Sequence, residues 1–281
     1  MLLLPVMAVL TIVILVPELW SLFLSLTNYS LGVPIRFIGI KNYVDLLSES
    51  GFLLAVVRNF VFVLLVVLLQ TIYGVGLALL LARGFPLQKL WLALLIVPIA
   101  ISPSVMAVIW KYLLNFNFGP IDWIVQQFGL PRIQWLSNPR LAFLTVSLVY
   151  VWASTPQVLV IVYPARLTFP QPLYESAAVE GASAWQTFRN VTWPLLQPVL
   201  SVVIVFRIMI AFRTFGIIWT MTQGGPDRST ETVAIYLYNE GFRYWKFGAA
   251  SAVALVMLVL TLVIAGGQMR TMYRNLFEEA S

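Results

Sequence analysis

The sequence contains no cysteine and no histidine, and only 10% of its 281 residues are charged. These absences exclude disulfides, thiolate or imidazole metal sites, cysteine nucleophiles and Ser-His-Asp triads. A soluble domain carries about 25% charged residues, far more than this chain could offer to water. A soluble globular enzyme and a disordered chain are therefore excluded as well.

Positive charge is in excess, with 17 Lys and Arg against 11 Asp and Glu, which gives a net charge of +6. The basic residues are scattered singly and form no run. A groove for nucleic acid needs clustered Lys and Arg, so nucleic acid is not expected among the partners. The charges are expected instead at membrane–water boundaries.

Hydrophobic residues make up 60% of the chain and gather in long runs. A membrane-spanning helix needs about 20 mostly apolar residues, and a β-barrel would show alternating segments of about 10 residues. The sequence predicts an all-α polytopic membrane protein with six transmembrane helices. The first begins at Met1 and is expected to be a retained helix, since its apolar run is too long for a signal core. The six predicted spans are Leu2–Leu26, Phe60–Ala82, Leu90–Leu114, Leu141–Tyr163, Val199–Met221 and Phe247–Gly267.

The segment Pro164–Pro198, between the fourth and fifth spans, is too long for a turn and too polar to cross a membrane. Glu175–Glu180 is expected to form a short helix that Gly181 ends. Ser183-x-x-Gln186 is a capping box that would open a second helix. We expect Pro194 and Pro198 to end that helix and lead into the fifth span.

This segment resembles the EAA loop of permeases from binding-protein-dependent ABC importers. Ser176 replaces the first Ala of that pattern, and Glu180 stands where relatives often have Asp. The residues in register with the pattern are Glu175, Ala177, Gly181 and Pro194.

The resemblance continues over almost the whole chain, which is similar to members of the maltose-type carbohydrate permease family. It implies the type I ABC importer permease fold, with one transmembrane domain over residues 1–281 and a cytoplasmic coupling loop at about 164–198. Lys and Arg counts leave the orientation open. The resemblance implies that both termini are cytoplasmic, in a bacterial inner membrane. The further matching elements are Phe37-Ile-Gly-Ile-Lys-Asn-Tyr43, Phe118-Gly-Pro-Ile-Asp122, Phe206-Arg-(x)4-Phe-Arg-Thr-Phe215 and Gly224-Gly-Pro-Asp227.

No Gly-x-x-x-x-Gly-Lys-[Ser/Thr] motif occurs, so the chain has no P-loop and is not expected to be an enzyme or to hold a cofactor. The resemblance implies two ATPase subunits that bind ATP and Mg²⁺, a second homologous permease, and an extracytoplasmic sugar-binding protein. It also implies that the loop helix docks on an ATPase. The residues expected to make this contact are Glu175, Ala177, Ala178, Glu180 and Gly181.

Polar residues in the spans suggest a substrate path. Tyr150, Ser154 and Gln157 recur at i, i+4 and i+7, which places them on one stripe of the fourth span. Trp152 lies close by, and Ser102-Pro103 interrupts the third span. Aromatic stacking on a sugar ring would suit Trp152 or Tyr150. The alternative reading is that these side chains only join helices together.

Two arginines, Arg207 and Arg213, lie inside the apolar fifth span, where each costs about 2.5–3.5 kcal/mol on insertion scales. Six helical positions would put them on faces about 120° apart, with Ala211 on the stripe of Arg207. Related permeases often have Asp where this chain has Gly216. One interpretation is that relatives with neutral substrates also carry these arginines, which pair with backbone carbonyls or with the partner permease. The other is that Arg207, together with Arg213, faces the cavity and attracts an anionic group on the sugar.

The sequence thus predicts a permease that imports a sugar or sugar derivative, neutral or anionic. An ion-coupled secondary transporter is the alternative, but it would need paired intramembrane acids, and Glu18 is the one acid clearly inside a predicted span. An intramembrane enzyme would need a catalytic set that this sequence does not offer.

Overall fold

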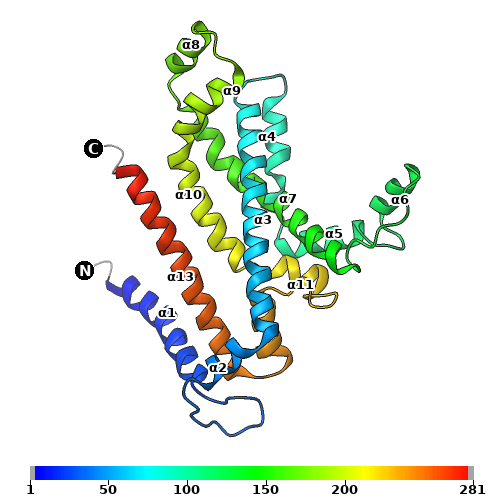
Figure 1. Cartoon of the computed structure of the whole chain (residues 1–281), viewed down its shortest axis with the longest axis vertical. Helices are drawn as coiled ribbons and strands as arrows, with labels where there is room; N and C mark the ends of the chain where they lie inside the picture. Colours follow the sequence, from blue (N-terminus) through cyan, green and yellow to red (C-terminus); the bar gives the residue numbers. More distant parts are fainter. Residues whose placement is uncertain (1–3, 278–281) are drawn as a thin grey trace. The chain divides into compact units, whose positions relative to one another are not determined.

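The computed structural model describes residues 4–277, and the regular structure of that part is helical (Figure 1). Side chains of residues 4–6, 8, 268–269 and 271–277 lie outside the description. The helices are α1 (Leu4–Ser25), α2 (Lys41–Ser48), α3 (Ser50–Leu81), α4 (Gln88–Ile96), η1 (Val97–Ala100), α5 (Pro103–Leu113), α6 (Pro120–Gln127), α7 (Pro139–Leu167), α8 (Gln171–Val179), α9 (Ala184–Thr187), η2 (Phe188–Thr192), α10 (Trp193–Phe212), α11 (Gly216–Thr222), α12 (Val233–Tyr238), η3 (Asn239–Arg243) and α13 (Phe247–Phe277).

Apolar helices overlap each of the six predicted spans, which confirms the all-helical membrane fold. Among the described residues four helical segments are long and apolar enough to cross a membrane alone, and α4–η1 with α5 forms a bent pair that passes the same test together. Val9–Ser25 of α1 is a shorter apolar helix, and the predicted start at Leu2 lies outside the described residues. The four are Ser50–Leu81, Pro139–Leu167, Ala184–Phe212 and Phe247–Gly267.

The third span is broken, as the Ser102-Pro103 pair predicts. Its two halves meet at an angle of 103°. Pro103 takes the first turn of α5, where its missing N–H leaves no helical hydrogen bond unmade. The 3-10 turn η1 closes the first half just before this break.

The fifth span differs from its predicted range Val199–Met221. The helical run begins at Ala184 and ends at Phe212, and α11 is a separate short helix. The prediction that Pro194 and Pro198 end the preceding helix is wrong. Pro194 stands in the first turn of α10, and the wider π-helical turn η2 immediately before it carries the chain through without a break.

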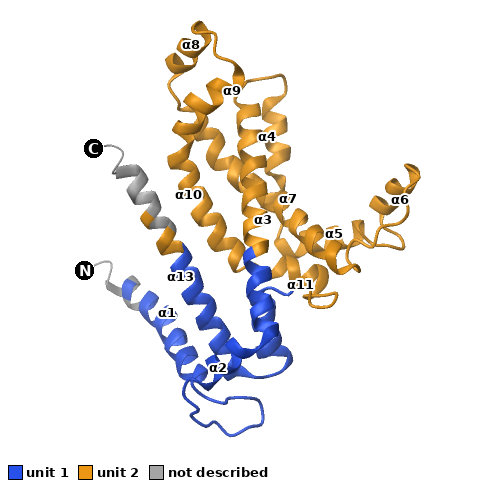
Figure 2. Cartoon of the chain, viewed as in Figure 1, with its two compact units in different colours: residues 1–60, 231–264 blue, residues 61–230, 265–281 orange. Residues whose placement is uncertain are grey.

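The chain divides into two compact units (Figure 2). Unit 2 comprises residues 61–230 and 265–281, and its apolar core joins α3, α7 and α10. Gly74 allows α3 to approach α7, because a Cβ there would lie 2.6 Å from the side chain of Val158. The core residues are Val75, Ala78, Leu81, Val158, Leu159, Val162, Leu196, Leu200 and Val203.

Unit 1 comprises residues 1–60 and 231–264. The segment 37–43, which follows α1, is held in place by hydrogen bonds of its residues Asn42 and Tyr43. Asn42 donates to the carbonyl oxygens of Ser25 at 2.7 Å and Thr27 at 2.8 Å, and the Tyr43 hydroxyl lies 2.7 Å from Ser25 Oγ. Gly248 of α13 lies so close to the Thr27 carbonyl that a side chain there would collide with it. This motif therefore fixes how the chain leaves α1.

The short helix α6 in unit 2 is anchored by one buried carboxylate. Asp122 is 2% exposed, and its Oδ1 accepts from the Ile133 amide at 3.0 Å and from Trp135 Nε1 at 3.2 Å. These bonds close the segment between α6 and α7 into a hairpin. The aromatic rings of Trp123 and Phe128 remain exposed on it.

Candidate translocation cavity and coupling segment

A cavity of about 300 Å³, lined by several polar side chains among apolar ones, lies in unit 2 beside the break in the third span. The predicted stripe of the fourth span, on α7, borders it with all three residues. The break borders it with Pro98 and Pro103. The full lining is Pro98, Ile99, Ile101, Pro103, Met106, Tyr150, Ala153, Ser154, Gln157, Arg207, Ile210, Arg213, Thr214, Phe215, Gly216 and Ile217.

Arg207 is buried at this cavity, with 3% of its surface exposed, and it joins three helices. Its Nε donates to Gln70 Oε1 on α3 at 3.1 Å, and its Nη1 donates to Gln157 Oε1 on α7. Its Nη2 donates to the Tyr150 hydroxyl at 3.3 Å. Hydrogen bonds from a charged donor are stronger than neutral ones, so this cluster ties α3, α7 and α10 together.

Gln70 is the member of this cluster that sequence reasoning missed. It is fully buried, and its Nε2 has no hydrogen-bond partner within the part of the chain that the structure describes. The available signal was a lone amide in the apolar run of the second span, since polar residues inside spans are costly and mark functional or packing sites.

Helical spacing predicts that Arg213 lies on a second face of the fifth span, about 120° from Arg207, and this prediction is wrong. Because α10 ends at Phe212, Arg213 is the residue that follows the helix, and it turns to the same cavity as Arg207. It is exposed, and its guanidinium makes no ion pair or hydrogen bond within the described residues. Ala211, which was predicted on the stripe of Arg207, is buried and is not among the lining residues of the cavity.

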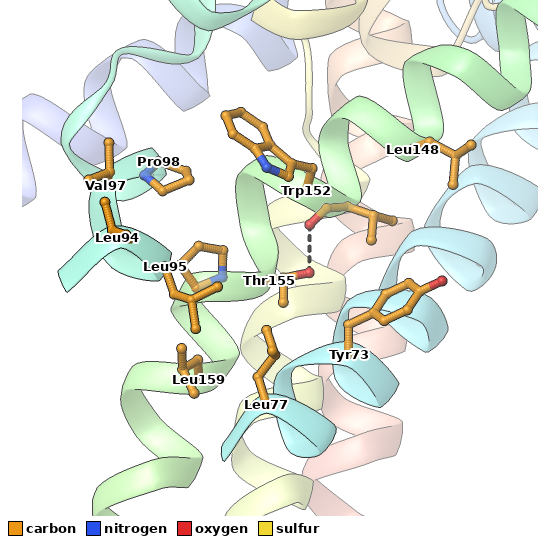
Figure 3. Close-up of a pocket in the computed structure, with 12 residues that line it drawn as sticks. Tyr73, Leu77, Leu94, Leu95, Val97, Pro98, Leu148, Trp152, Thr155 and Leu159 are labelled. Carbon is orange, nitrogen blue, oxygen red and sulfur yellow. Dashed lines mark hydrogen bonds between the residues drawn. The ribbon is translucent and has the colours of Figure 1, made fainter. Parts of the chain in front are cut away.

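Two other predicted path residues, Ser102 and Trp152, do not line this cavity. Ser102 is the residue before α5 and is not among the lining residues of the cavity. Trp152 lies two positions from Tyr150, about 200° around α7, and borders a separate apolar pocket of about 390 Å³. Figure 3 shows its ring with Pro98, Leu95 and Thr155, and the Thr155 hydroxyl donates to the Val151 carbonyl at 2.7 Å. Trp152 also packs edge-to-face on Trp110 of α5, with centroids 5.3 Å apart.

The predicted coupling residues lie on α8 and the turn after it. The helix ends at Val179, and Gly181 has a φ of +74°, a conformation that glycine adopts without strain. The amide of Ala182 donates to the Ala177 carbonyl at 2.9 Å, which completes the turn. The Ser183–Gln186 capping box is present at the start of α9.

Burial separates the coupling residues into two groups. Ala177 is 8% exposed and is covered by other residues of this chain. Glu175, Ala178, Glu180 and Gly181 are exposed. The neighbouring apolar side chains of Val179 and Trp185 are 90% and 67% exposed and were not predicted as part of this surface.

The α8 segment is held to its own chain by aromatic contacts. The Arg166 guanidinium lies 4.0 Å from the ring centroid of Tyr174, and the Tyr174 hydroxyl lies 3.2 Å from Thr192 Oγ1. Such cation–π contacts contribute about 0.5–2 kcal/mol. The helix is therefore tied to the ends of α7 and η2 on one side, with its acidic residues left open.

Comparison with known proteins gives consistent matches over most of the chain. The trehalose/maltose transport system permease protein MalF of Thermococcus litoralis is 30% identical over 263 residues, which cover 93% of this chain and 89% of that protein. The sulfoquinovosyl glycerol transport system permease protein SmoG of Agrobacterium fabrum is 30% identical and covers 96% and 88%.

A crystal structure of a bacterial ABC transporter that imports the acidic polysaccharide alginate shares the fold. Its TM-score is 0.86 at 22% identity, with 97% of this chain and 94% of that chain covered. Residues 74–269 match the family described as binding-protein-dependent transport system inner membrane component. The ion-coupled secondary transporter is therefore not supported, and this chain is a permease subunit that belongs to the family of binding-protein-dependent transport system inner membrane components.

Proposed function

We propose that this chain is the permease subunit of an ATP-driven ABC importer that moves a sugar or sugar derivative across a bacterial inner membrane. The single observation that carries this proposal is the family match over residues 74–269. Three relatives, each about 30% identical over more than nine-tenths of this chain, are named for transport of trehalose/maltose, sulfoquinovosyl glycerol and diacetylchitobiose. Carbohydrate is the chemistry that these names share.

The cavity beside Arg207 suits a sugar. Its polar side chains, among them Ser154, Gln157 and Tyr150, can exchange hydrogen bonds with hydroxyl groups. The ring of Phe215 provides an apolar surface against which a pyranose could stack. A few placed polar groups in a mainly apolar cavity is the usual composition of a small-molecule site.

The partners follow from this role. An extracytoplasmic binding protein delivers the sugar, a second homologous permease completes the path, and two ATPase subunits bind ATP and Mg²⁺. The whole chain then acts as one transmembrane domain, with both termini and the 164–198 loop in the cytoplasm. The chain itself holds no nucleotide and catalyses no reaction.

Coupling to ATP would run through the exposed surface of α8 and its following turn. Glu175 and Glu180 offer carboxylates to basic groups of an ATPase, and Val179 and Trp185 offer apolar area. The turn at Gly181 sets the angle between α8 and α9. Closure of the ATPases would move this surface as a lever and reopen the spans toward the outside.

A glycine pair tests the coupling segment. The complete importer, with its binding protein and ATPases, is reconstituted in vesicles, and ATP-dependent sugar uptake is compared with ATP hydrolysis. Gly181→Ala should reduce uptake per ATP hydrolysed, because a side chain strains the turn that presents α8. Gly84→Ala is the control, since Gly84 has a similar φ of +69° in an open turn between α3 and α4.

The outcomes separate the proposals. Equal coupling in both glycine variants would contradict the role of the α8 segment. Uptake of sugar that continues without ATP, or without this chain, would contradict the importer itself. Uptake that collapses with an ion gradient instead of with ATP would restore the secondary transporter.

A further inference from the structure

The cavity beside Arg207 has an excess of positive charge. Two of its lining residues, Arg207 and Arg213, are cationic, and its lining contains no Asp or Glu. The three groups that accept hydrogen bonds from Arg207 are a phenol and two amides, all neutral. They satisfy N–H groups without balancing the charge.

Donors also outnumber acceptors around the guanidinium. Arginine has five N–H groups, and Arg207 uses one on Nε and one on each Nη. One N–H on each Nη is left, and Arg207 itself borders the cavity. The occupant that completes this cluster therefore supplies acceptors, which a carboxylate or sulfonate does without adding donors.

The position where a local counter-ion could stand holds glycine. Gly216 borders the same cavity as Arg213, and a Cβ built there would meet Ser104 Oγ at 3.4 Å, an ordinary contact. The backbone thus has room for a side chain, including an acidic one. Because no acidic side chain stands at position 216, Arg213 has no ion-pair partner within the described residues. Arg213 borders the same cavity as Arg207.

Resting on the proposed function, we propose that the cavity takes an anionic sugar derivative, one that carries a carboxylate or sulfonate, in preference to a neutral sugar. Arg207 receives the anionic group with its unused N–H groups, and Arg213 attracts it into the cavity. Arginine suits both roles, because its planar fork matches these oxyanions and it stays charged inside the membrane. Gln157, Tyr150 and Ser154 remain for the hydroxyl groups.

The first experiment identifies the charge of the cargo. Cells that express the complete importer, and matched cells that lack only this chain, are grown on a mixed hydrolysate of neutral and uronic acid polysaccharides supplemented with sulfoquinovose. Mass spectrometry then records which solutes only the first cells deplete. The expected solutes carry a carboxylate or sulfonate. Depletion of neutral sugars alone overturns the inference and leaves the importer intact, whereas depletion of no sugar overturns both.

The second experiment places the preference in this cavity. Initial uptake of a depleted solute is compared for Gly216→Asp and Gly216→Asn, which add side chains of the same size, with equal membrane levels checked by immunoblot. The carboxylate should raise the KM for an anionic solute by about tenfold more than the amide does, because it neutralises Arg213 and repels the cargo. Equal effects of the two variants overturn the inference.

Arg213→Gln supplies the complementary measurement. Loss of this charge should raise the KM for the anionic solute by several-fold, with an effect that shrinks as salt increases, because exposed charges are screened. Arg213→Lys should retain most of the affinity. A KM unchanged in Arg213→Gln would show that the charge serves only the protein structure and would overturn the assignment.

Discussion

Arg207 on α10 connects this helix to α3 and α7 within unit 2. Its side chain brings a charge into an apolar helix and donates hydrogen bonds to neutral oxygens on two other helices. Removing one acceptor leaves part of a buried charged group without a hydrogen bond, which is more costly than losing a contact between neutral groups. The side chain of Gln70 is the acceptor that lies farthest from Arg207 in sequence, and it makes no contribution to the lining of the cavity.

Gln70→Leu should therefore lower the stability of the purified chain in detergent. The expected loss is about 1–2 kcal/mol, between the mean for hydrogen bonds inside membranes and that for charged donors. Thermal unfolding followed by circular dichroism measures it. Gln70→Glu keeps an acceptor and adds a balancing charge, so it should be at least as stable as the wild type. A Gln70→Leu chain as stable as the wild type would contradict this account of the cluster.

The crossing of α3 and α7 depends on backbone proximity. Gly74 meets the side chain of Val158, while Gly76, two residues further along α3, has nothing within 4 Å of the place where its Cβ would stand. Small residues allow membrane helices to pack closely, because association there relies on van der Waals contact. Gly74 and Gly76 thus have different roles, although they are only two residues apart on α3.

Gly74→Ala should destabilise the chain by about 1–3 kcal/mol, the usual range for overpacking, because the helices must separate to admit the methyl group. Gly76→Ala should be neutral or slightly stabilising, because alanine favours the helix more than glycine does. The midpoint of thermal unfolding of both variants measures the difference. Equal midpoints would mean that the close approach at Gly74 has no energetic weight.

The α6 hairpin depends on the carboxylate of Asp122. Asp122→Ala removes the acceptor for the Ile133 amide and for Trp135 at once, so the hairpin should open locally without global unfolding. Hydrogen exchange over residues 120–135 should accelerate by at least about tenfold, while α7 remains protected. Asp122→Asn keeps Oδ1 as an acceptor, so its rate of hydrogen exchange should lie between those of the wild type and Asp122→Ala. Unchanged exchange in Asp122→Ala would refute this role.

Local signals predicted most of the elements. Apolar runs predicted the spans, the Ser183–Gln186 box predicted the start of α9, and Pro103 predicted the break in the third span. Each of these signals determines the backbone structure of residues that are close to it in the sequence. The end of α10 at Phe212 could not be predicted, since no Gly or Pro marks it. Pro194 misled the prediction because the π-helical turn before it has no sequence signature.

The site was predictable only in part, because helical spacing indicates which residues share a face of one helix but not which helices pack together. Helical spacing placed Tyr150, Ser154 and Gln157 together, and the same spacing shows that Trp152 lies on the opposite side of α7. The partnership of Arg207 with Gln70 joins residues 137 positions apart. Such a pairing depends on how the helices pack and leaves no pattern in a single sequence.

The orientation of the whole chain can be tested directly, because the sequence has no cysteine to give background labelling. Single cysteines at Ser48 and Thr168, both exposed, mark the two sides of the proposed topology. In intact spheroplasts a membrane-impermeant maleimide should label Ser48→Cys and leave Thr168→Cys unlabelled. Permeabilised membranes should allow both to react. Labelling of Thr168→Cys from outside would reverse the proposed orientation.

The break in the third span also gives the cavity a mechanical character. An intact helix resists bending through its ladder of hydrogen bonds, but Pro103 donates none across the 103° turn. Backbone rotation at Ile101 and Ser102 can change the angle between α4 and α5 without breaking a helical bond. Pro98, Ile99 and Ile101 of the cavity lining lie at this break, whereas Arg207 is held by hydrogen bonds to α3 and α7. One wall of the cavity can therefore move more easily than the wall that contains Arg207.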